Sequence, residues 1–82
     1  MDRFQALETF IAVAETGAFN GAAQRLGQSP PAVTRIIAQL EARLGVTLFL
    51  RTTRQVRLSE SGERFLHDAR RVLSDLRDAE AS

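Results

Sequence analysis

Residues 19–44 hold two helical patterns separated by a short turn, and this arrangement limits the possible folds more than any other feature of the chain. The first pattern places small or apolar residues at helical spacing, namely Ala22, Ala23 and Leu26. A turn is predicted at residues 27–29, where Gly27 tolerates backbone angles that other residues avoid. The second helix is predicted to begin at Pro31, because proline suits a first helical position and disfavours helical geometry in the residue before it. Two helices joined by about three or four residues predict a helix-turn-helix unit.

The second of these helices has an apolar side and a polar side. Its inner side is predicted to comprise Val33, Ile37, Leu40 and Leu44, and its outer side Pro31, Thr34, Arg35 and Ala38. A helix in this position of the unit can enter the major groove of DNA with its first turns against the base edges. Arg35 is the best candidate for a base contact, since arginine can bond to both O6 and N7 of guanine. The alternatives are a solvated surface charge for Arg35 and a phosphate contact for Thr34.

The remaining segments predict a winged form of the helix-turn-helix. Apolar residues at helical spacing predict a first helix that ends at Gly17, and they are Phe4, Leu7, Phe10, Ile11 and Ala14. Residues 48–50 and 56–58 are predicted strands, joined by an open loop because the linking residues include no glycine or asparagine. Ser59 is predicted to cap a last helix that runs to about Ala79. The predicted fold is mainly α, with a three-helix core and a two-stranded wing in residues 1–58 and a long linker helix in residues 59–82.

The apolar side of the last helix is wider than a small core should need. We expect most of it to be exposed to water in a monomer, because a helix of about 20 residues spans about 30 Å, roughly the whole domain. A second copy of the chain is the simplest partner for this side. The residues predicted to form the dimer interface are Leu66, Ala69, Val72, Leu73 and Leu76.

Positive charge is concentrated in the middle of the chain. The formal net charge is only +1, yet residues 16–59 carry six arginines against the single acid Glu41, whereas residues 1–15 and 60–82 each sum to −2. A basic segment around a helix-turn-helix predicts double-stranded DNA as the partner.

Composition argues against several other classes of protein. Eighty-two residues make one small domain, and the absence of cysteine excludes a disulfide, a thiol nucleophile and cysteine-ligated zinc. His67 has no second histidine to share a metal ion. We therefore predict no catalytic residue, no metal site, no cofactor in this chain and no enzyme activity. No apolar run is long enough to span a membrane, and the cytoplasm is the expected location.

Several segments resemble one protein family in register. They include Glu15-Thr16-Gly17-Ala18-Phe19, Ala22-Ala23-Gln24-Arg25-Leu26, Pro31-Ala32-Val33-Thr34-Arg35, Leu44-Gly45-Val46 and Leu58-Ser59-Glu60-Ser61-Gly62. Together they resemble the N-terminal domain of the LysR-type transcriptional regulators of bacteria, over nearly the whole chain and without a gap. The resemblance implies a winged helix-turn-helix that binds an operator, a linker helix that dimerises, and a C-terminal domain for a small effector molecule. It also implies a tetramer of the full-length protein and indirect contact with RNA polymerase. Because the implied C-terminal domain is not in these 82 residues, this chain is expected to be a fragment.

The resemblance also implies which residues contact DNA. Carried over by position, they are Ser29, Pro30, Pro31, Thr34, Arg35 and Ile36 in the recognition helix, 31–44, and Arg51 and Arg54 in the wing, 48–58, at the adjacent minor groove. The family commonly has glutamine in place of Pro30, a polar residue in place of Ile36 and an aliphatic one in place of Gln28. Pro30 and Ile36 would offer only apolar contact to thymine methyl groups, so no base preference is carried over. For Arg51 the alternative is an ion pair with Glu41 or Glu63.

A second function is compatible with the same scaffold. Winged-helix domains also serve as protein-protein interaction modules, and a fold alone does not determine function. A neutral or acidic surface around Arg35 and Arg54 would favour this alternative.

Overall fold

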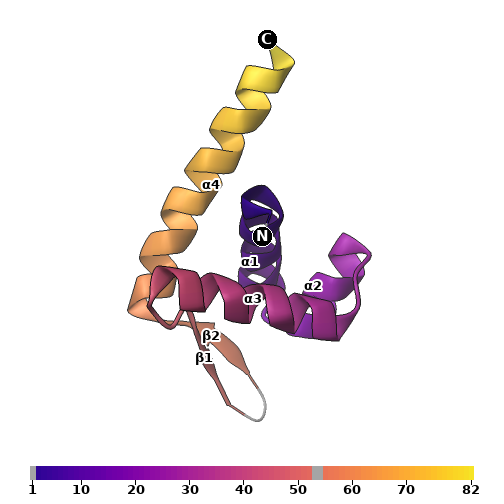
Figure 1. Cartoon of the computed structure of the whole chain (residues 1–82), viewed down its shortest axis with the longest axis vertical. Helices are drawn as coiled ribbons and strands as arrows, with labels where there is room; N and C mark the ends of the chain where they lie inside the picture. The colour runs from indigo at the N-terminus through magenta and orange to yellow at the C-terminus, as the bar shows by residue number, and fades with distance from the viewer. Residues whose placement is uncertain (1, 53–54) are drawn as a thin grey trace.

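The computed structural model describes residues 2–52 and 55–82. In this part of the chain four helices surround a small core and a two-stranded antiparallel sheet extends from it (Figure 1). The elements are α1 (Arg3–Thr16), α2 (Phe19–Leu26), α3 (Pro30–Leu44), β1 (Phe49–Arg51), β2 (Val56–Leu58) and α4 (Glu60–Ala81). The mainly α, winged helix-turn-helix fold predicted from the sequence is confirmed.

Local sequence signals account for most of the helix ends. Gly17 and Gly27 end α1 and α2 in the left-handed region, with φ of 71° and 66°. Ser59 caps α4 as predicted, since its side chain accepts a hydrogen bond from the amide of Gly62. Helix α3 begins at Pro30, one residue earlier than predicted. Ser29 supplies the cap for α3, and Pro30 takes the first helical position despite the proline that follows it.

Phe10 of α1 lies at the centre of the core and joins three parts of the fold. Its ring is 5.2 Å from the ring of Phe49 in β1 and 5.1 Å from the ring of Phe65 in α4, centroid to centroid. Tilted and edge-on ring pairs at this spacing stabilise the packing beyond the area they bury. The helix-turn-helix contributes fully buried Val33 and Ile37 from α3. The wing and α4 are therefore packed on the same core as the recognition helix.

The two strands of the wing are held together by regular antiparallel pairing. Phe49 pairs with Leu58 and Arg51 with Val56, and hydrogen bonds between Thr52 and Gln55 continue the pairing by one more step. The loop predicted between the strands includes residues 53 and 54, which lie outside the described residues. The backbone amide of Thr52 donates to the carbonyl oxygen of Gln55, so the two strands remain paired as far as these residues.

Helix α4 packs on α1 and β2, and its C-terminal end projects beyond the other elements (Figure 1). Ala69 and Leu73 are 1% and 6% exposed within the single chain. The prediction that these two residues would be exposed in a monomer is therefore wrong. Because α4 packs on α1, these two residues on the side that was expected to await a partner are covered within the chain. Val72 remains 40% exposed and Leu76 is half-buried.

Within residues 2–52 and 55–82, no helix combines the length and apolar character that crossing a membrane requires.

Candidate nucleic-acid interface

The N-terminal half of α3 presents one continuous exposed surface. The exposed residues on it are Ser29, Pro30, Pro31, Thr34 and Arg35. The opposite side of the same helix is buried through Val33, Ile37 and Leu40. The sequence-based assignment of an inner and an outer side of this helix is thus confirmed for these residues, although Leu44, predicted to be inside, is 39% exposed at the end of the helix.

The first turn of α3 has few backbone donors to offer a ligand. Pro30 and Pro31 have no N–H group. The amide of Ala32 donates to the side-chain oxygen of Ser29 at 3.3 Å, and the amide of Val33 donates to the carbonyl oxygen of Ser29 at 3.1 Å. An anion at this helix end would therefore be bound mainly by side chains. The hydroxyl groups of Ser29 and Thr34 and the guanidinium of Arg35 are the groups available for this.

Ile36 does not belong to the exposed surface. Its side chain is 8% exposed and packs in the core, three residues after Val33 and four before Leu40. Residues at these spacings lie on one side of a helix. The structure therefore places Ile36, a predicted DNA contact, in the core and not on the exposed surface of α3.

Arg51 of the wing is held by an aromatic ring and not by an acid. Its guanidinium carbon lies 4.3 Å from the centroid of the Phe19 ring at the start of α2. The alternative ion pair with Glu41 or Glu63 is absent from the described part of the chain. Instead, the carboxylate of Glu41 accepts hydrogen bonds from the amides of Leu48 and Phe49, at 2.7 and 3.2 Å, and so ties the end of α3 to the wing. Arg54, the other predicted wing contact, lies outside the described residues.

The arginines of the middle segment differ in what they contact. Arg25 is bound to Glu15, whereas Arg35, Arg43 and Arg57 are exposed and form no ion pair within residues 2–52 and 55–82. Unpaired, exposed arginines can neutralise phosphates, because their charge is not already balanced. No group of histidine, cysteine or acidic residues in the described ranges could hold a metal ion.

Three contacts between elements were missed by the sequence analysis. The stacking of Phe19 on Arg51 joins residues 32 positions apart, and the ion pairs of Glu15 with Arg25 and Arg70 join three helices. The hydrogen bonds from both arginines hold the pKa of Glu15 below its ordinary value. Phe19 and Glu15 lie near predicted helix ends and could be singled out in the sequence. Their partners could not, because the partners depend on how the helices pack.

Known proteins of similar sequence include regulators whose chains are longer than this one. Residues 4–63 match the profile described as "Bacterial regulatory helix-turn-helix protein, lysR family". An uncharacterized HTH-type transcriptional regulator of the ibpB-leuC intergenic region of Azotobacter vinelandii is 53% identical over 72 residues, which are 88% of this chain and 50% of that protein. The HTH-type transcriptional regulator ClcR of Pseudomonas putida is 54% identical over 70 residues, 85% of this chain and 24% of ClcR. This chain thus spans half or less of the length of these relatives.

Solved structures show the same fold. The CbnR DNA-binding domain in complex with DNA is 44% identical, with a TM-score of 0.84 over 98% of this chain and 99% of that one. The BenM DNA-binding domain bound to the benA site 1 DNA is 32% identical, with a TM-score of 0.93 over 96% of this chain and 89% of that one. The family and these relatives are transcription regulators and not enzymes, which confirms the class of protein predicted from the sequence. By its profile match and its fold, this chain belongs to the lysR family of bacterial regulatory helix-turn-helix proteins.

Proposed function

We propose that this chain binds double-stranded DNA at specific sequences and serves a transcription regulator as its operator-binding domain. The observation that carries the proposal is the outward position of Thr34 and Arg35 at the N-terminal end of α3. Neither side chain is engaged by another described residue, so both are available to a ligand. Structures of the relatives CbnR and BenM with DNA support the proposal, because their folds match this chain closely.

In the proposed complex the first turns of α3 enter the major groove. Arg35 bonds to the O6 and N7 atoms of a guanine, while Thr34 and Ser29 bond to phosphate oxygens. Pro30 and Pro31 supply apolar contact to thymine methyl groups. Because Pro30 and Pro31 have no N–H group and the amides of Ala32 and Val33 are bonded to Ser29, most of the available donors at this helix end are side chains.

The wing lies at the adjacent minor groove in this proposal. Arg51 contacts the DNA backbone from its position against Phe19, and Arg54 is expected to reach the same groove. Such contacts position the protein and carry little sequence information. The protein-protein alternative is less well supported. Glu41 is the only acid in α3, and it lies toward the C-terminal end of the helix, with its carboxylate bound to wing amides.

The DNA-bound form is proposed to be a dimer formed through α4. With Ala69 and Leu73 buried in the chain, the interface reduces to Val72, Leu76 and the half-buried Leu66. A two-fold axis through this helix would present two copies of α3 to successive half-sites on one face of the duplex. In the full-length protein, an effector domain, a tetramer and indirect contact with RNA polymerase are expected by analogy with the family.

Arg35→Ala tests the proposal, with Arg43→Ala as its matched control. Both arginines are exposed on α3, but Arg43 is at the far end of the helix from the proposed contact surface. After selection of a preferred sequence, Arg35→Ala should reduce discrimination at one position per half-site by about 1–3 kcal/mol. Arg43→Ala should leave the preference unchanged. Wild-type binding should weaken steeply with salt.

Two results would contradict the proposal. One is affinity that does not change between low and high salt, since phosphate neutralisation releases counterions. The other is an Arg35→Ala variant that keeps the wild-type base preference at every position.

A further inference from the structure

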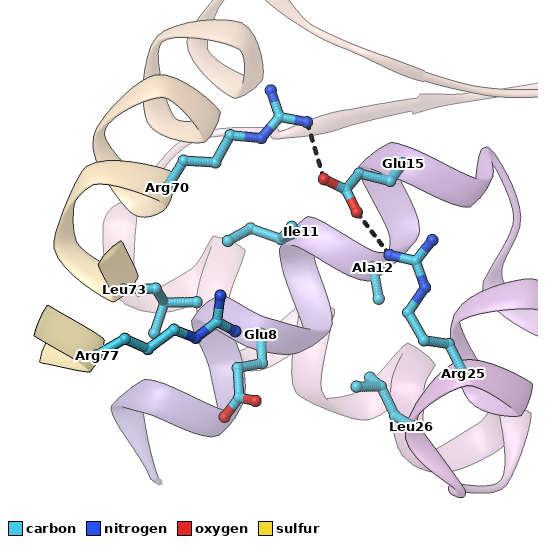
Figure 2. A pocket seen from close by; sticks show the side chains of 9 residues that line it. All are labelled: Glu8, Ile11, Ala12, Glu15, Arg25, Leu26, Arg70, Leu73 and Arg77. Atoms are coloured by element: carbon cyan, nitrogen blue, oxygen red, sulfur yellow. Dashed lines mark hydrogen bonds and ion pairs between the residues drawn. The ribbon is translucent and has the colours of Figure 1, made fainter. Parts of the chain in front are cut away.

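The carboxylate of Glu15 joins two helices that have different tasks in the proposed function. Its Oε1 atom lies 2.6 Å from Nη1 of Arg25 in α2, and its Oε2 atom lies 3.0 Å from Nη2 of Arg70 in α4 (Figure 2). Arg25 belongs to the helix-turn-helix and Arg70 to the linker helix. The other ion pair of the described residues, Arg71 with Asp68, is internal to α4. Within residues 2–52 and 55–82, ion pairs between different elements thus converge on Glu15.

Among the described residues, α4 has no extensive packing with α2. Helix α4 packs on α1 and β2, whereas α3 packs on α1 and α2, so α1 stands between the linker helix and the recognition helix. Beside Glu15 a hollow of about 230 Å³ separates α2 from α4, with Leu26 on one side and Leu73 and Arg77 on the other (Figure 2). Side chains do not fill this space. Beside this hollow, the two ion pairs of Glu15 link α1 to both α2 and α4, in addition to the packing of α4 on α1.

We propose that Glu15 is a positioning residue that holds α4 at a set angle to the helix-turn-helix and thereby selects the separation of the two DNA half-sites that a dimer can occupy. This inference rests on the DNA binding and the dimerisation proposed above. Glu15 itself lies in α1, away from the exposed surface of α3, so it acts through the orientation of the helices and not through contact with DNA.

The length of α4 explains why weak contacts can have this effect. Eleven residues follow Arg70 in the helix, and they extend about 16 Å. A rotation of α4 by about 10° would move its end by about 3 Å, close to the 3.4 Å rise of one base pair. In a symmetric dimer the same rotation occurs in both copies. The two recognition helices are therefore displaced symmetrically, and the distance between them changes. The preferred separation of half-sites then depends on the angle that Glu15 maintains.

The first test measures this angle without DNA. The chain has no cysteine, so Gln24→Cys on α2 and Glu80→Cys on α4 provide unique sites for spin labels. The labelled chain is mixed with an excess of unlabelled chain, and the distance distribution is recorded by pulsed electron resonance. Arg70→Gln should broaden the distribution, and Arg70→Lys, which keeps the charge, should restore most of the wild-type width.

Asp68→Asn is the matched control for this test. It removes one charge and one ion pair of similar exposure, but that pair lies within α4 and links no two elements. Its distance distribution should equal that of the wild type. An Arg70→Gln distribution as narrow as the wild type would overturn the inference, whatever the DNA results.

The second test uses duplexes that carry two half-sites at separations varied by single base pairs. Arg70→Gln should lower the preference for the best separation over its neighbours by about threefold, as the loss of a partly exposed ion pair allows. Its affinity for a single half-site should match that of the wild type. An unchanged separation profile would also overturn the inference. If wild-type protein binds no duplex at all, the proposed function fails, and the distance measurement alone decides whether Glu15 sets the angle.

Discussion

The guanidinium carbon of Arg51 lies 4.3 Å from the centre of the Phe19 ring, so the first strand of the wing is stacked on the start of α2. The same ring contacts Phe49 edge-on at 6.2 Å. Phe19 thus supports the wing through one charged and one aromatic neighbour. This contact keeps a basic side chain of the wing at a defined distance from the helix-turn-helix, as the proposed simultaneous contact with two grooves requires.

Phe19→Leu should loosen the wing while the core stays folded. A cation–π contact at an exposed site contributes about 0.5–1 kcal/mol, so hydrogen exchange of the β1 and β2 amides should accelerate about two- to fivefold. Phe4→Leu is the matched control, because Phe4 is 44% exposed and makes no ring contact among the described residues. Equal wing exchange in both variants would show that the stacking does not stabilise the wing.

Gly62→Ala should destabilise the domain, because the start of α4 lies against the backbone of the wing. A Cβ atom at this position would be 2.2 Å from the carbonyl oxygen of Leu48. Backbone atoms cannot yield as a flexible side chain does, so we expect a loss of about 1–3 kcal/mol in the free energy of unfolding, measured by urea titration. Gly45→Ala is a useful comparison, since that site is open but has a φ of +72°. It should cost about 1 kcal/mol through backbone strain alone.

Val72→Glu should prevent association through α4 without unfolding the chain. Val72 is 40% exposed within one chain, so a charge there is solvated in the monomer and unfavourable only in an interface. Sedimentation should give the mass of a single chain, 9.1 kDa, with the helical circular dichroism retained.

Ser74→Glu adds the same charge at an exposed position on a different side of α4 and should remain associated. Leu73→Glu is not suitable for this purpose, because Leu73 is buried and its replacement should unfold the domain. A Val72→Glu protein with the mass of a dimer would contradict the proposed interface.

The stability provided by Glu15 should depend on pH in a defined direction. The hydrogen bonds from Arg25 and Arg70 lower the pKa of Glu15 in the folded chain. The contribution of Glu15 to the free energy of unfolding is therefore fully present above the pKa that this residue has in the unfolded chain. It is lost as pH falls through the lower pKa that Glu15 has in the folded chain.

The melting temperature of Glu15→Gln should accordingly lie about 1–4 °C below that of the wild type at pH 7, a modest difference because the groups are partly exposed. The difference should shrink as pH falls below about 4.5. Glu8→Gln, on the same helix but with no ion pair in the described ranges, should show little difference at either pH. A constant difference for Glu15→Gln across this range would contradict the assigned charge interaction.

Features that depend on neighbouring residues in the chain were predictable from the sequence. The helix ends at Gly17 and Gly27, the cap at Ser59 and the two short strands follow from local preferences for backbone angle and hydrogen bonding. The outward position of Thr34 and Arg35 also followed, because a helix with one apolar side can bury only that side.

The packing of helices against one another decided the rest. The burial of Ile36 depends on which elements pack against α3, and the burial of Leu73 depends on which elements pack against α4. The periodicity of the sequence alone does not contain that information. The partners of Glu15 and Arg51 are likewise residues 10 to 55 positions away. The sequence by itself determined which elements form and which side of α3 faces outward, because both are set by interactions over a few residues. Only the tertiary structure decided which charges and apolar residues remain free for DNA or a second chain, because that depends on contacts between distant segments.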